Sequence, residues 1–137
     1  MAVSSATNAG IFNPKVIRIA LTGVAATTGG AVAGVLNPLG VDLIVYQAVV
    51  QTTTESTGAA NLDIGIGATA TTSNDTLFDG IAVGTAALLK AASVTHGTNG
   101  FGAVKWGAAQ YLTVTGSAST AGLVGVLYVI AVEEDVV

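Results

Sequence analysis

The chain has 137 residues, 51% of them hydrophobic and only 9% charged, and its formal net charge is −4. This length gives one domain with a substantial core, and the four scattered basic residues provide no stripe for binding nucleic acid. The absence of cysteine excludes disulfides and thiolate metal sites. So few charges cannot cover the surface of a monomer, and we therefore expect a homo-oligomer, with a trimer as the expected form.

The mean hydropathy of +0.72 raises the question of a membrane protein. The longest apolar stretch, residues 23–50, is interrupted by Thr and Gly at 27–30, by Asn37-Pro38 and by Asp42. No piece of it reaches the roughly 18 uninterrupted apolar residues of a spanning helix. The first ten residues also lack the basic start and apolar centre of a signal peptide. The sequence predicts a soluble protein with unusually apolar strands and no membrane partner.

The predicted elements follow from β-branched residues and from glycine-marked turns. Residues 1–14 are mostly small and polar and are expected to form an N-terminal arm, whereas residues 23–36 are expected to form a loop rich in Gly, Ala and Thr. That loop ends in the turn Asn37-Pro38-Leu39-Gly40. Residues 77–90 are ambiguous, because AALLKAA has helical propensity but Gly84-Thr85 disfavours a long helix. Strands are expected at 15–22, 41–53, 61–67, 104–106, 111–116 and 122–132.

Seven or eight short strands separated by glycine-marked turns predict an all-β fold. The expected architecture is an antiparallel, jelly-roll-like β-sandwich that forms a single domain over residues 15–137. No internal repeat and no second domain boundary is visible in the sequence.

The segment NLDIGIGATATTSNDT contains G-x-G-x-x-A after a strand-like run, with glycines at 65 and 67. A dinucleotide fingerprint needs a helix to begin at the second glycine, but the Thr, Ser and Asn that follow disfavour a helix. The ribose-binding acid is also missing, because no acidic residue lies between Asp79 and Glu133. We therefore expect no nucleotide cofactor. The glycines are expected to let the backbone pass close to a neighbouring strand or bulge.

Other chemistry has little support in the sequence. Asn74, Asp75 and Asp79 lack the spacing of a calcium loop, and turn capping is the expected role, although a loose cation site near the two aspartates stays open. His96 is the only histidine, and no G-x-S-x-G motif accompanies it. We expect no enzyme, no cofactor and no metal.

Aromatic and bulky residues are the remaining candidates for contacts. Trp106 and Tyr111 are expected in the core or at an oligomer interface, and a sugar-stacking platform is the alternative. Ile11 and Phe12 are the bulkiest side chains of the arm and would anchor it on a partner. The C-terminal residues EEDVV are expected to form a solvated tail.

Three segments together carry a resemblance to a known class: residues 37–85 (NPLGVDLIVYQ to FDGIAVGT), 97–119 (GTNGFGAVKWGAAQYLTVTGSAS) and 121–132 (AGLVGVLYVIAV). Their order resembles that of small virion proteins of tailed bacteriophages and prophages, which include capsid decoration, or cement, proteins. The resemblance spans roughly residues 15–132 and contains no catalytic signature.

The resemblance implies a jelly-roll-like β-sandwich that oligomerises, commonly as a trimer, on the head lattice. It implies a virion protein on the capsid exterior, made in the host cytoplasm, with the major capsid protein as its partner. Ile11, Phe12 and Pro14 are then the candidate capsid contacts. The alternative is a tail, fibre or head-spike protein that binds host glycans, in which Trp106 and Tyr111 would be exposed. A β-sandwich enzyme would instead need Asp75, Asp79 and His96 in one pocket.

Overall fold

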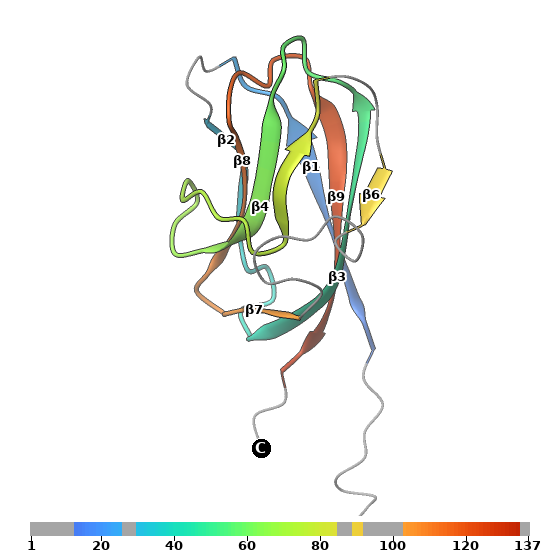
Figure 1. The fold of residues 1–137 in the computed structure, drawn as a ribbon. Helices are drawn as coiled ribbons and strands as arrows, with labels where there is room; N and C mark the ends of the chain where they lie inside the picture. The colour runs from blue at the N-terminus through green and yellow to red at the C-terminus, as the bar shows by residue number, and fades with distance from the viewer. Residues whose placement is uncertain (1–12, 26–29, 85–88, 92–102, 135–137) are drawn as a thin grey trace, which may run out of the picture.

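The structure is a computed structural model that describes residues 13–25, 30–84, 89–91 and 103–134 (Figure 1). All regular secondary structure in these residues is β-strand, arranged as two antiparallel sheets that pack face to face. The strands are β1 (Lys15–Thr22), β2 (Gly30–Leu36), β3 (Leu43–Thr54), β4 (Asn61–Gly67), β5 (Phe78–Ala82), β6 (Leu89–Ala91), β7 (Val104–Trp106), β8 (Tyr111–Gly116) and β9 (Val124–Glu133).

The strand order is that of a jelly roll. The first sheet has the order β1-β9-β3-β6, and β7 also pairs with β3, whereas the second sheet has the order β2-β8-β4-β5. With β7 set aside, each sheet contains four strands. β1 and β2 lie in opposite sheets, and so do β3 and β4. This is the arrangement of two interlocked Greek keys. The predicted antiparallel, jelly-roll-like β-sandwich is therefore confirmed.

The core lies between the two sheets and follows from period-2 alternation along each strand. In β9 every second residue is buried, and Leu127 and Val129 are fully enclosed. In β4 the inward residues are Leu62, Ile64 and Ile66, which face the first sheet across the core. Burying each such side chain contributes about 1.5–3 kcal/mol, so this layer supplies most of the driving force for folding.

The prediction from the sequence missed one strand. Residues 30–36 were expected in a loop but form β2, an edge strand of the second sheet whose one partner among the described strands is β8. Its small residues suit a close approach: a Cβ on Gly34 would collide with the carbonyl group of Ala70. The ambiguous stretch 77–90 contains β5 and the first two residues of β6, and the bounds expected for β1, β4, β7 and β8 are the observed ones.

The loop that follows β4 explains the glycine motif. Residues 68–77, named here the covering loop, fold back against the outer face of the second sheet. A Cβ on Gly65 would collide with the Asn74 side chain and lie 2.7 Å from Thr76 Oγ1. Ser73 Oγ lies 2.9 Å from Thr115 Oγ1, so hydroxyl groups join the loop to β8. The close neighbour of Gly65 is therefore the loop after its own strand, and not the neighbouring strand or bulge that was expected.

Candidate functional site

Several segments meet at one end of the sandwich, named here the turn end. It contains the β2–β3 turn (residues 37–42), the β7–β8 turn (residues 107–110) and the last residues of β9 (Figure 1). The register places the start of β1 there too, because Lys15 and Val45 pair with Ala131 from opposite sides. The N-terminal segment therefore leaves the sandwich at the same end as the β2–β3 turn.

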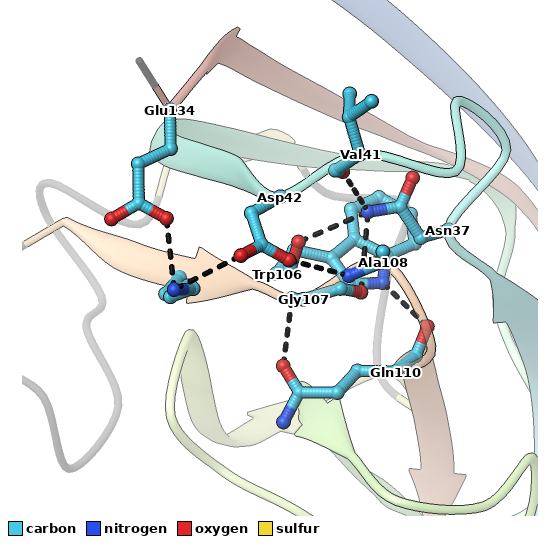
Figure 2. A network of polar contacts seen from close by, with 9 residues as sticks. Asn37, Val41, Asp42, Trp106, Gly107, Ala108, Gln110 and Glu134 are labelled. Atoms are coloured by element: carbon cyan, nitrogen blue, oxygen red, sulfur yellow. Dashed lines mark hydrogen bonds and ion pairs between the residues drawn. The ribbon is translucent and has the colours of Figure 1, made fainter. Parts of the chain in front are cut away.

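Asn37 holds the turn end together through its side chain, which is almost fully buried (Figure 2). Its amide nitrogen donates to the carbonyl oxygens of Val41 (2.8 Å), Trp106 (3.0 Å) and Gly107 (3.2 Å). Its Oδ1 accepts hydrogen bonds from two backbone N–H groups of its own turn, at 3.0 and 3.2 Å. The single amide therefore closes its turn and ties it to a segment 69 residues away in sequence.

Trp106 belongs to the core of this chain. Its side chain is fully buried, and its indole N–H donates to the carbonyl oxygen of Gln110 at 2.9 Å. The Gln110 side chain in turn accepts from the backbone N–H of Gly107 at 2.7 Å. The indole has no exposed surface left to offer to another subunit or to a sugar. Of the two expected positions, the core and an oligomer interface, the structure shows the core, so the Trp106 indole is not exposed for the stacking platform that the glycan alternative places there with Tyr111.

A short ion-pair chain closes the same end (Figure 2). Lys105 Nζ lies 3.1 Å from Asp42 Oδ2 and 2.8 Å from Glu134 Oε2, and Asp42 Oδ1 accepts from the backbone N–H of Ala108 at 2.8 Å. The bond from Ala108, with Lys105 second, holds the pKa of Asp42 below its usual value. The two carboxylates, Glu134 first, raise the pKa of Lys105. The expected solvated tail is thus corrected: Glu133 ends β9 and Glu134 is an ion-pair partner.

Three apolar side chains project from this braced turn. Leu36, Leu39 and Val41 are between 42% and 48% exposed, and they form what we name the turn patch. Because Asn37 and Gly40, which has a φ of 67°, fix the backbone between them, the patch is presented on an ordered turn. A surface that is ordered before binding loses little conformational entropy on contact with a partner.

The sequence-derived contact residues fall in different places. Pro14 is exposed just before β1, at the turn end, whereas Ile11 and Phe12 lie outside the described residues. Tyr111 is half-buried on β8 and pairs with Leu36, so it adjoins the turn patch. Its assignment to an oligomer interface stays a prediction.

The candidate cation and catalytic residues are not gathered into a site in the part of the chain that the structure describes. Asn74 Oδ1 accepts from the backbone N–H of Thr76 at 3.0 Å, which confirms the expected turn cap. Asp79 is exposed and Asp75 is half-buried on the covering loop, and His96 lies outside the described residues. No group of three His, Cys, Asp or Glu side chains among the described residues is placed to hold a metal ion.

Sequence reasoning missed the turn patch. The signal was present, because a leucine inside Asn-Pro-Leu-Gly cannot enter the core without breaking the turn. Its two apolar neighbours lie on either side of this turn, and only the structure shows that both face solvent.

Comparison with known proteins adds no identification: no protein-family model, curated protein or solved structure matches the chain. In the described residues, no helix combines the length and hydropathy needed to cross a membrane.

Proposed function

We propose that the chain is a capsid decoration protein of a tailed bacteriophage or prophage, which binds the major-capsid lattice as a homo-oligomer, most simply a trimer. The observation that carries the proposal beyond the sequence resemblance is the turn end. There an ordered apolar patch and the exit point of the N-terminal segment share one end of a rigid sandwich. A cement protein needs such an end, because one end must bind the many equivalent sites of the capsid while the rest of the molecule faces outward.

The mode of attachment is a two-part contact. The turn patch seats on the lattice as a rigid body, and the arm, with Ile11 and Phe12, adds along a groove or sheet edge of the shell. Burying one large apolar side chain contributes about 1.5–3 kcal/mol, and an oligomer multiplies weak contacts through avidity. Pro14 lies where the arm leaves the sandwich and sets its direction, because proline fixes φ.

The test is the binding of purified chain to heads assembled without it. Leu39→Asp places a charge at the centre of the turn patch, and deletion of residues 2–12 removes the arm. Both changes are expected to weaken binding at least tenfold while the melting temperature of the sandwich stays within a few degrees. The matched control is Ala59→Asp, which adds the same charge to an exposed position in the β3–β4 loop.

Electron microscopy of the same particles locates the protein. Regularly spaced density on the outside of the head is the expected result. Density on the tail or at a spike would favour the glycan-binding alternative, and unchanged binding by both variants would remove the turn end from the proposal.

A further inference from the structure

The outer faces of the two sheets differ in the size of their side chains. The outer face of the second sheet carries small residues, such as Gly65 and Thr113, and the covering loop folds over it, so that both positions are buried. On the first sheet, β9 presents Val124, Val126, Tyr128, Ile130 and Val132 away from the core, on the side opposite Leu127 and its buried neighbours.

A strand with one side in water normally alternates apolar residues on the core side with polar residues on the solvent side. In β9 the sequence VGVLYVIAV is apolar at nearly every position, which is the pattern of a strand buried on both sides. The chain's own core buries one side. On the other side Val126, Tyr128, Ile130 and Val132 keep partial exposure, whereas the positions under the covering loop are buried.

The flanking strands extend the apolar face and give it a polar margin. Val16 on β1 is 65% exposed and pairs with Ile130, and Val49 on β3 pairs with Tyr128. Polar and charged groups stand beside the central strand on these flanks, with Arg18 on the edge strand β1 and Gln51 on β3. An apolar centre with a polar rim is the anatomy of a protein–protein interface.

The size of this face suits self-association. The ten residues of β9 make a strand about 33 Å long, and three strands are about 14 Å wide, which gives about 450 Å² in projection. Counted on two partners this is about 900 Å², and standing side chains make the accessible area larger than the projected one. The contact therefore approaches the roughly 1,200 Å² at which stable interfaces begin.

We infer that the outer face of β1, β9 and β3 is the surface through which copies of this chain meet. The occupant is a second copy, because copies that turn this face toward a common symmetry axis each contribute the same apolar centre, and the single arginine lies at the rim, where it stays hydrated. The inference rests on the proposed function for its biological sense, since it names the self-association surface of the decoration protein. Its test needs no phage particles, so either conclusion can fail without the other.

The first measurement is the mass of the protein in solution by sedimentation at micromolar concentration. The unmodified chain is expected to sediment at two or more times the 13.4 kDa of one chain. Val126→Lys, on the central strand of the face, is expected to reduce the mass to that of one chain with the β-sheet circular dichroism unchanged. Leu39→Lys, in the turn patch, is the control and is expected to leave the mass unchanged.

The second measurement keeps the inference testable if Val126→Lys does not fold. Because the chain has no cysteine, Val126→Cys introduces a single thiol, and Ala59→Cys introduces one outside the face. Packed sheets lie about 10 Å apart, so a short bismaleimide is expected to link copies at position 126 and not at position 59.

Three results would overturn the inference. They are a monomeric unmodified chain, a Val126→Lys variant that folds and keeps the full mass, or equal cross-linking at both positions. If deletion of residues 2–12 converts a monomer into an oligomer, the arm of the same chain covers the face instead.

Discussion

Replacing Asn37 with alanine tests whether one amide braces the turn end. The change removes five hydrogen bonds at 2.8–3.2 Å. The bond to the Trp106 carbonyl is buried, and losing a buried hydrogen bond that water does not replace costs about 2 kcal/mol. The other four are partly buried, so water replaces them at a cost of about 0.5 kcal/mol each. We expect Asn37→Ala to lower the free energy of unfolding by about 4 kcal/mol.

The assay is urea unfolding followed by the fluorescence of the single tryptophan, which is fully buried and bonded to the same network. Protein concentration is held constant, because self-association adds to apparent stability. The control is Asn74→Ala, which loses one partly buried bond and is expected to cost about 0.5–1 kcal/mol. Asn37→Asp is expected to be at least as damaging as Asn37→Ala, because it turns a carboxylate oxygen toward three carbonyl oxygens. If Asn37→Ala costs no more than Asn74→Ala, the turn end is not braced by this side chain.

Three further predictions concern charge, packing and ligands. The pKa of Asp42 is lowered from its usual 3.8 and the pKa of Lys105 is raised from its usual 10.5. The two charges therefore contribute fully to the free energy of unfolding between these pH values. The free energy of unfolding of the unmodified chain is therefore expected to exceed that of Lys105→Met between pH 3.8 and pH 10.5, and this difference is expected to shrink outside that range. A difference that does not change with pH would contradict the ion-pair chain. Gly65→Ala is expected to cost about 1–3 kcal/mol by displacing the covering loop, whereas Gly58→Ala, which meets nothing within 4 Å, is expected to change stability by less than about 0.5 kcal/mol. Millimolar NAD or ATP, and EDTA, are expected to leave the melting temperature unchanged, and a fall with EDTA would instead make Asp75 and Asp79 cation ligands.

The sequence predicted those parts of the fold that local chemistry decides. Lys15–Thr22 alternates along β1, so this strand was predicted with its observed bounds, and Asn37-Pro38-Leu39-Gly40 combines residues that favour a turn, which lies within the observed turn of residues 37–42. It did not predict β2, because GAVAGVL carries few β-branched residues and is held as a strand by its pairing with β8 and by the approach of Ala70.

The candidate site was harder to predict because it depends on contacts between distant segments. A three-residue strand gives no useful alternation, so nothing local places Trp106 inside the core rather than at a subunit interface. Lys105 and Glu134 are 29 positions apart, and only the pairing of β7 and β9 with β3 brings them together. The role of Gly65 depends on a loop that returns to the same strand.

The pairing of β1 with β9 has a consequence for synthesis of the protein. Lys15 pairs with Ala131 and Thr22 with Val124, so among the described strands the first finds its hydrogen-bonded partner only when the last has been made. β9 also lies between β1 and β3, which means that the nascent first sheet lacks its middle while the ribosome is still translating. Contacts this distant in sequence slow folding and leave strand edges open to aggregation. A ribosome that stops before residue 124 therefore releases a chain that cannot complete its first sheet, and such a fragment is a substrate for chaperones and proteases rather than a smaller working protein.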